Sequence, residues 1–280
     1  MGEIVMAAKI THVPTIWMSH TIEKYHGLRD SALAGYASLQ KLARSAGVET
    51  FLIFDTHWLV NQGFHMNGKP RHEGNFTSHE LPHMLNNMVY GYDGDPDLAD
   101  LIAAEVIAAG GRAIAHKGNE LGVEYGTLVP MYFINQDAYA NVASVAVNQF
   151  ASIDESRQWG AAVARAIKKS DRRVAVLASG SLSHSFWPNH LSVDGVNQVN
   201  GEFNRQMDLH VLKMWQAGQW DEFLDMLPEY AVKCEGEGAM NDTAMLFGAL
   251  GWKDYEGRPT IHTPYFGSSG TGQVNVSFSV

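Results

Sequence analysis

The stretch Thr50–Trp58, TFLIFDTHW, constrains the fold most, because an apolar run leads directly into a charged and coordinating pair, Asp55 and His57. A short run rich in β-branched and aromatic residues predicts a buried strand over Thr50–Phe54. In an open α/β sheet, reactive side chains gather just beyond the carboxyl ends of such strands. We therefore expect His57 to lie in a crevice at one edge of a sheet.

Two other apolar runs end in the same way. Ile4–Ile10 leads into His12, and Val174–Ala178 leads through a Gly/Ser turn into His184. A single histidine after a strand is more often a hydrogen-bonded structural residue than a functional one. Three histidines in the same topological position favour one shared site.

The rest of the chain alternates helical and strand patterns. Apolar spacing and capping residues predict the following helices and strands: helices over Leu28–Ala46, Asp97–Ala109, Glu155–Lys168, Phe203–Trp215, Glu222–Leu227 and Thr243–Leu250, and strands over Arg112–His116 and Asn141–Val147. Asp95 followed by proline predicts the N-cap of the second helix. The long segment Val60–Asn87 has few helix or strand signals, and we interpret it as an irregular wall of the site.

Composition limits the partners. The formal charge of −10 argues against a nucleic-acid surface or an acidic membrane, so we expect a small-molecule partner. The single cysteine, Cys234, excludes an intrachain disulfide and suits a reducing cytoplasm. Met1–Ala8 lacks the features of a signal peptide, and no apolar run approaches the roughly 20 residues of a membrane helix. We expect a cytoplasmic protein.

Only the sheet could bring the two imidazoles of His12 and His57 together. A metal site needs a third ligand beside them. Glu237 is the candidate, since the glycines on either side of it let the backbone come close. Two imidazoles and one carboxylate with open positions are typical of non-haem Fe(II) oxygenases, and the same set suits catalytic zinc. These residues therefore predict a metal site and leave the metal open.

Several short motifs together resemble the type III extradiol ring-cleavage dioxygenases, the protocatechuate 4,5-dioxygenase-like superfamily. The likeness spans essentially the whole chain, and within the superfamily it is strongest to members that open 3,4-dihydroxyphenylacetate. The motifs are KITHVP with His12, FDTHW with His57, EYGTLVP with Tyr125, ASGSLSH with His184, GEGAMNDT with Glu237, and the tail SSGTGQVN.

The resemblance implies a function for each motif. Fe(II) would be bound by His12, His57 and Glu237, with Glu235 as the alternative carboxylate two residues away. His184 would be the acid/base residue, a role that histidine suits because its unperturbed pKa of ~6.5 gives access to both forms near neutral pH. The substrates would be a catechol and O₂, and the protein would be a homo-oligomer.

Two further residues are expected to support the site. Asp55 and Tyr125 could orient ligands or donate hydrogen bonds from behind them. For Asp55, capping of backbone amides at a strand end is an equal alternative. At Tyr125 the chain departs from the protocatechuate-type pattern, in which a histidine is usual at this point.

Other functions stay open at the level of sequence. A zinc-dependent hydrolase is the main rival enzyme, another catechol or an aminophenol is the main rival substrate, and a non-catalytic homologue is the rival outside enzymes. A serine hydrolase is disfavoured, because Ser185 stands where the nucleophile-elbow pattern after Ser183 needs glycine. Candidate groups for binding a substrate carboxylate are Lys9, Arg71, His79 and His83, and the tail Ser268–Asn275 is a candidate for closing the site or an interface.

We therefore expect residues 1–280 to form one catalytic domain of the α/β class. Its architecture would be a three-layer α/β/α sandwich around a mixed, largely parallel central sheet. The reaction would be Fe(II)-dependent extradiol opening of 3,4-dihydroxyphenylacetate to a 2-hydroxymuconic semialdehyde product.

Overall fold

The computed structural model describes all residues, Met1–Val280. Its strands are β1 (Glu3–Ile10), β2 (Thr50–Leu59), β3 (Phe64–Asn67), β4 (Arg71–Phe76), β5 (Met88–Asp93), β6 (Ala113–His116), β7 (Asn141–Val147), β8 (Arg173–Ser179), β9 (Pro259–Ser268) and β10 (Thr271–Phe278). Its α-helices are α1 (Pro14–Thr21), α2 (Asp30–Ser45), α3 (Pro96–Ala108), α4 (Tyr125–Ile134), α5 (Ile153–Lys169), α6 (Glu202–Ala217), α7 (Trp220–Lys233) and α8 (Asn241–Ala249). None of these helices is both long and apolar enough to cross a membrane.

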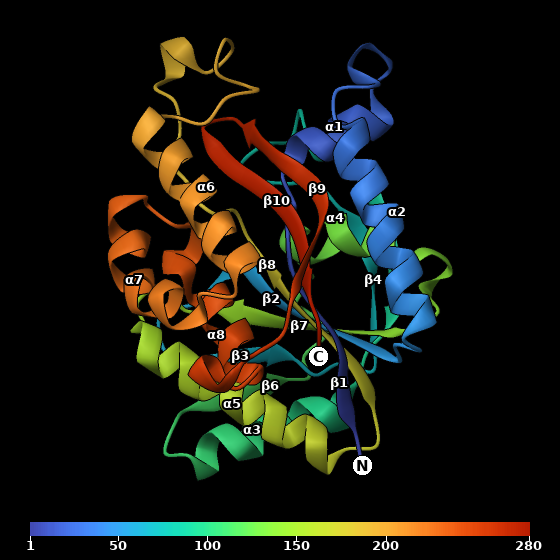
Figure 1. Ribbon diagram of the computed structural model, residues 1–280. Coiled ribbons are helices and arrows are strands. Elements are labelled where there is room, and N and C mark those ends of the chain that lie inside the picture. The colour runs from blue at the N-terminus through green and yellow to red at the C-terminus, as the bar shows by residue number, and fades with distance from the viewer.

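An eight-stranded sheet runs through the molecule in the order β6-β3-β7-β2-β8-β1-β10-β9 (Figure 1). Its centre is parallel, because β2 pairs with β7 and β8, and β8 also pairs with β1. Toward one edge β10 runs antiparallel to β1 and β9, and toward the other β3 runs antiparallel to β7. The prediction of a mixed, largely parallel sheet is confirmed.

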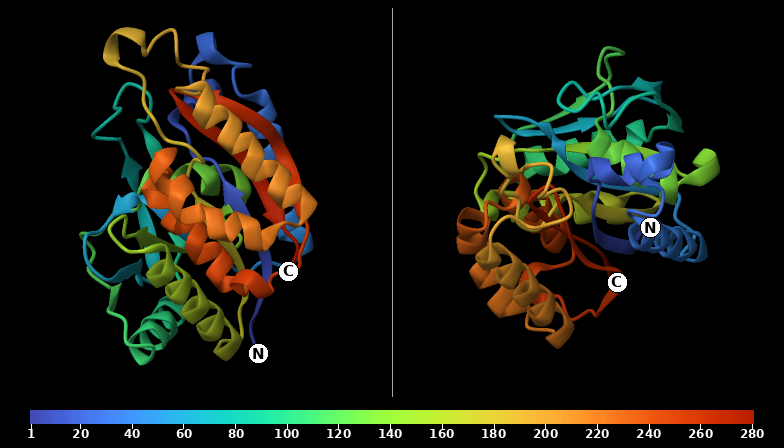
Figure 2. Two further views of the ribbon diagram at one scale, coloured as in Figure 1. Left: turned by 60° about the vertical axis from the view of Figure 1, so that its left-hand side comes forward. Right: turned by 90° about the horizontal axis from the view of Figure 1, so that it is seen from above.

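Helices cover both faces of this sheet. In Figure 1, α1 and α2 (blue) lie on one side of the β9–β10 hairpin (red), and α6 and α7 (orange) lie on the other; Figure 2 (left) turns the α6–α7 side toward the viewer. Along β2, Phe51 and Ile53 join one hydrophobic core while Leu52 and Phe54 join the other. A strand buried on both faces reads as a continuous apolar run, which is why TFLIF predicted it. The three-layer α/β/α sandwich is confirmed.

The segment Val60–Asn87 was wrongly predicted to be irregular. It contains β3 and β4, and β4 pairs antiparallel with β5 to form a separate two-stranded sheet. The residues of β4, RHEGNF, are mostly exposed and polar, so they show no apolar alternation that would predict a strand. Its stability comes from pairing with β5, a tertiary feature that local pattern does not carry.

Several boundaries also differ from prediction. β2 continues past Phe54 to Leu59, so His57 lies within the strand and not in a loop after it. The stretch after His12 contains α1, and α7 extends well beyond Glu222–Leu227. The predicted N-cap is confirmed, because the Asp95 carboxylate accepts a hydrogen bond from the backbone amide of Leu98 at 3.2 Å.

Candidate metal centre

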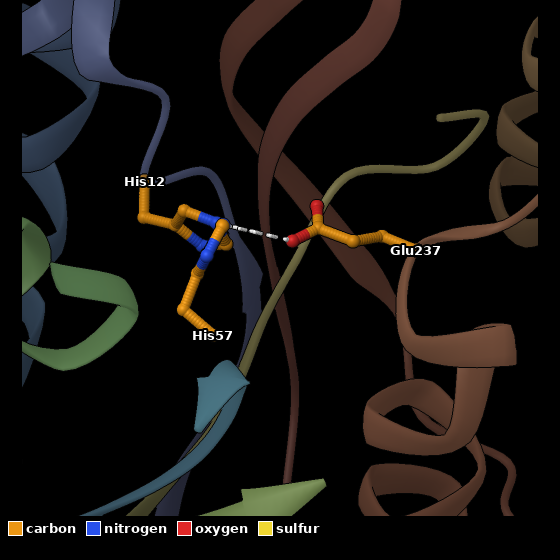
Figure 3. A group of neighbouring side chains, drawn as sticks. All are labelled: His12, His57 and Glu237. Carbon is orange, nitrogen blue, oxygen red and sulfur yellow. Dashed lines mark ion pairs between the residues drawn. The ribbon is translucent and has the colours of Figure 1, made fainter. Parts of the chain in front are cut away.

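Three side chains from distant parts of the chain converge at the carboxyl ends of the central strands (Figure 3). His12 follows β1, His57 lies near the end of β2, and Glu237 begins a short 3₁₀ helix, Glu237–Met240. Their ligand atoms all lie within 4.8 Å of one another. Glu237 Oε1 is 3.2 Å from His12 Nε2 and 3.5 Å from His57 Nε2. β1 and β2 both pair with β8, so the sheet itself sets the spacing of the two histidines.

A serine fixes the orientation of the His12 ring. Ser179, the last residue of β8, donates from its hydroxyl to the carbonyl of Gly126 at 2.5 Å. Ser179 Oγ therefore accepts at 3.0 Å from the Nδ1–H of His12. This bond orients the ring so that Nε2 of His12 is directed at Glu237 Oε1. Hydrogen bonds of this kind commonly orient metal-binding histidines.

The Glu237 carboxylate is buried and held on both oxygens. Oε2 accepts from the backbone amide of Ser181, and Oε1 accepts from the hydroxyl of Thr56, each at 2.5 Å. Burial alone would raise its pKa, but the neighbouring His12 and His184 outweigh burial and hold the pKa of Glu237 well below its usual range. The carboxylate is therefore ionised and available as an oxygen ligand.

His57 completes the group as a neutral imidazole. Burial, reinforced by the neighbouring His12, lowers the pKa of His57 to about 3. The Tyr125 ring lies against it, with ring centroids 3.7 Å apart. A neutral imidazole and an ionised carboxylate are the forms in which these side chains bind metals. The donor set therefore fits a divalent transition metal held on one face.

His184 faces the same group from its other side. Its Nε2 lies 3.8 Å from Glu237 Oε2, and its side chain is 23% exposed. The backbone amide of His184 donates to the carbonyl of Cys234, and the residue forms an isolated β-bridge with Thr271. The structure thus brings all three strand-end histidines together, with His184 beside the three-residue group and not within it.

Asp55 and Tyr125 flank the group in different ways. The Asp55 carboxylate is fully buried and accepts from the backbone amide of His57 at 2.8 Å and from the Thr127 hydroxyl at 2.7 Å. It therefore holds the backbone of His57. Burial raises the pKa of Tyr125 above its usual value, so its phenol keeps its proton.

The structure separates the two carboxylates that sequence left open. Glu237 lies against His12 and His57, whereas Glu235 is exposed and accepts a hydrogen bond from the Ser185 hydroxyl at 3.3 Å. The residues that sequence reasoning missed are Ser179, Thr56 and Thr127. Nothing in the local sequence distinguishes them from other serine and threonine hydroxyls, because their partners lie 53 or more positions away.

A comparison of the sequence with protein families decides what this geometry belongs to. Residues 6–279 match the family described as "Catalytic LigB subunit of aromatic ring-opening dioxygenase". The chain belongs to this family. It is an enzyme, an aromatic ring-opening dioxygenase.

Relatives agree with family membership, and a solved structure agrees with the fold. Over 270 residues, 95% of this chain and 97% of its relative, the sequence is 46% identical to 3,4-dihydroxyphenylacetate 2,3-dioxygenase of Escherichia coli. It is 22% identical over 244 residues, 83% of this chain, to the 2-aminophenol 1,6-dioxygenase beta subunit of a Pseudomonas species, of which 78% is covered. A crystal structure of an uncharacterized Escherichia coli K12 protein matches with a TM-score of 0.64 at 16% identity, covering 97% of this chain and 98% of that one, and supports the fold alone.

Membership of the LigB family excludes the hydrolase alternatives, and the hydrogen bonds of the serines near His184 agree with this. The Ser183 hydroxyl donates to Asp208 at 2.7 Å, and Ser181 Oγ accepts from Gln273 at 2.5 Å. Both hydroxyls therefore serve structural hydrogen bonds, and neither bonds to His184.

Two candidates for binding a substrate carboxylate are engaged elsewhere. Lys9 is 1% exposed and forms a buried ion pair with Asp242, so it is not free to reach a ligand. Arg71 lies on β4, where it is paired with Glu73 and Asp93. His79 and His83 are both exposed, on the segment between β4 and β5.

Gly126→Ala tests how tightly the residues behind the metal-binding group are packed. A Cβ at Gly126 would lie 2.1 Å from Asp55 Oδ1, so Gly126→Ala must displace the carboxylate that holds His57. We expect a loss of about 1–3 kcal/mol in the free energy of unfolding, measured by denaturant titration, together with weaker metal binding. The control is Gly122→Ala, because a Cβ there meets no atom within 4 Å. Equal stability of the two variants would contradict the packing argument.

Glu124, the residue before α4, provides a pH test of the same region. Burial first, and then the carboxylates of Asp55 and Glu80, raise its pKa from 4.5 to about 7. A raised carboxyl pKa means that the folded state holds the proton more tightly, so Glu124 costs stability as pH rises from about 4.5 to 7. Glu124→Gln should therefore gain stability over the unsubstituted protein in that window and hold the gain above pH 7. Unfolding of both metal-free proteins at pH 5 and pH 8 measures this, and a difference that does not widen would contradict it.

Proposed function

We propose that this protein is an extradiol dioxygenase that uses Fe(II) and O₂ to open 3,4-dihydroxyphenylacetate beside its diol, inserting both oxygen atoms. The observation that carries the proposal is the 46% identity over nearly the whole chain to an Escherichia coli enzyme named for that substrate. The convergence of two imidazoles and one carboxylate supports it, because this is the ligand arrangement of non-haem iron oxygenases. Each chain would hold one iron on His12, His57 and Glu237.

Iron is favoured over zinc by the reaction. When bound, Fe(II) supplies a redox-active centre with open positions for both catechol oxygens and for O₂, whereas zinc has no accessible redox change. The chain's own contribution is to hold the three ligand atoms within 4.8 Å of one another. Ser179 and Asp55 would act by positioning His12 and His57.

His184 would move the protons of the reaction. Its Nε2 faces the ligand group, so it could take a proton there from a catechol hydroxyl and return it later in the cycle. Tyr125 would act as a hydrogen-bond donor beside the substrate, because its phenol stays protonated. This division gives the bound catechol one base and one fixed donor.

The substrate is tested by comparing kcat/KM for 3,4-dihydroxyphenylacetate, unsubstituted catechol and 2-aminophenol under the same conditions. We expect 3,4-dihydroxyphenylacetate to be preferred by at least about tenfold, which corresponds to ~1.4 kcal/mol of transition-state binding to its carboxymethyl group. The yellow ring-opened product is followed by its absorbance. Equal rates for catechol would overturn the substrate, and a preference for 2-aminophenol would move it toward the reaction named for the Pseudomonas relative.

We also propose that residues 1–280 form one catalytic domain and that the protein is a homo-oligomer. All the residues assigned to the site come from a single chain, so each copy would be complete. Light scattering on the purified protein measures the mass directly. A fully active monomer would contradict the proposed homo-oligomer and leave the assignment of the site unaffected.

A further inference from the structure

A buried carboxylate lies close behind His184. Asp208, in the middle of α6, is 0% exposed and accepts four hydrogen bonds. Oδ1 accepts from the backbone amide of Ser183 at 3.2 Å and from the Tyr230 hydroxyl at 2.5 Å. Oδ2 accepts from the Ser183 hydroxyl at 2.7 Å and from the Tyr265 hydroxyl at 2.5 Å. Both carboxylate oxygens are thus occupied, and two of the four bonds go to the residue that precedes His184.

These bonds tie the turn that carries His184 to three other elements. Tyr230 belongs to α7 and Tyr265 to β9, so α6, α7 and the β9–β10 hairpin meet at one carboxylate. Gly272 on β10 packs directly on it, since a Cβ there would lie 1.8 Å from Asp208 Oδ2. The backbone amide of Gly272 also donates to the carbonyl of Ser183, so β10 contacts both Asp208 and Ser183.

No lysine, arginine or histidine forms an ion pair with Asp208; every donor is a hydroxyl or a backbone amide. Burying an ionisable group in this way is costly unless it is fully hydrogen-bonded, and an apolar residue of similar volume is often at least as stabilising. A network of short, directional bonds fixes geometry more than it adds stability. What it fixes here is Ser183, and through one peptide bond, His184.

We propose that Asp208 is a positioning residue that holds His184 in place for proton transfer. This inference rests on the acid/base role proposed above for His184. Asp208 acts at one remove, because it bonds to Ser183 and not to the histidine. Removing it should therefore lower turnover while leaving the metal group, whose ligands are held by other contacts, in place.

The main test is Asp208→Ala with Asp95→Ala as a matched control. Asp95 is also a buried carboxylate, accepting from Leu98, Thr50 and Arg172, but it caps α3 at the opposite end of β2. Both changes should lower the melting temperature. Only Asp208→Ala should lower kcat per metal-loaded site, by about 10–100-fold, with KM and metal content nearly unchanged, as expected when a proton-transfer group is misplaced. Normal kcat in folded, metal-loaded Asp208→Ala would overturn the proposal.

Rescue by a conservative variant separates positioning from charge. In Asp208→Asn the amide oxygen can keep the bond from the Ser183 amide, while the hydroxyls of Ser183 and Tyr265 can rotate to accept from the new NH₂ group. Most of the turnover should therefore return. If Asp208→Ala does not fold, the double change Ser183→Ala with Tyr265→Phe takes its place, because it removes two donors and keeps the carboxylate. An unaltered kcat in that double variant would count against the proposal.

A double-mutant cycle with His184→Asn shows whether Asp208 acts through the histidine. If it does, Asp208→Ala should cost little further turnover once His184 is already replaced. Independent, additive losses would overturn the positioning role and leave the acid/base role standing. A nearly normal turnover in His184→Asn alone would instead remove the acid/base role itself, so the two failures are distinguishable.

Discussion

Glu237→Ala should lose both its metal and its ring-cleaving activity. The carboxylate supplies the only oxygen in the three-residue group, and its two remaining hydrogen bonds, from Ser181 and Thr56, show that the protein holds it for a partner on the histidine side. Changes to residues behind metal ligands typically cost 10–100-fold in affinity or activity, so loss of a ligand should cost more than about 100-fold. His12→Ala and His57→Ala should behave alike. Metal content by elemental analysis and turnover on one preparation measure the effect.

Glu235→Ala is the matched control for that experiment. Glu235 is a carboxylate two positions away in the same loop, but it is exposed and directed at Ser185. We expect its replacement to leave metal content and turnover within about twofold of normal. Retained metal in Glu237→Ala together with loss in Glu235→Ala would show that the wrong carboxylate has been assigned.

His184→Asn should keep the metal and lose turnover by roughly 10²–10⁴-fold, the range typical of losing a positioned proton-transfer group. Asparagine keeps a hydrogen-bonding group of similar reach but cannot exchange a proton near neutral pH. Because His184 lies beside the ligand group and not in it, metal content and catechol affinity should stay close to normal.

A purely structural role for His184 makes the opposite prediction. Its backbone amide bonds to Cys234 and it bridges to Thr271, so a structural residue here would, when changed, lower the melting temperature. Turnover per folded, metal-loaded site would then be nearly normal. Measuring metal content, melting temperature and turnover on the same preparation distinguishes the two, and the second pattern would take His184 out of the reaction.

Sequence predicted the parts of this fold that follow from burial. The apolar runs before His12, His57 and His184 became adjacent parallel strands β1, β2 and β8, because strands covered on both faces by helices carry continuous hydrophobic sequence. Parallel strands end at a common edge, which is why three separate histidines could be expected at one site.

Sequence did not predict the parts that depend on distant partners. The strand β4 is exposed and polar, so it has no apolar period to detect, and it pairs only with β5. The residues that hold the ligands are equally hard to predict. The Ser179 hydroxyl hydrogen-bonds to His12 from 167 positions away, and the Thr56 hydroxyl hydrogen-bonds to Glu237 from 181 positions away. A lone serine or threonine at a strand end gives no local sign of such a partner.

The choice of Glu237 over Glu235 also required coordinates. Both glutamates lie in one loop with glycines beside them, and the sequence does not show which of the two faces the histidines. In the structure Glu237 is buried beside His12 and His57 and Glu235 is exposed. The loop turns sharply after Glu237, where Gly238, Ala239 and Met240 all take positive φ values of 56°, 56° and 58°. Consecutive residues in this region are unusual outside glycine, and the buried Met240 side chain helps to hold the turn.

The most direct test of the central claim is ring opening by protein purified without oxygen, stripped of metal, and reloaded with either Fe(II) or Zn(II). With 3,4-dihydroxyphenylacetate and air, the Fe(II)-loaded protein should form the yellow semialdehyde with one O₂ consumed per substrate. The Zn(II)-loaded protein should form none, because zinc cannot take part in a redox reaction. Equal activity with zinc, or no yellow product from the fully Fe(II)-loaded protein, would contradict the account.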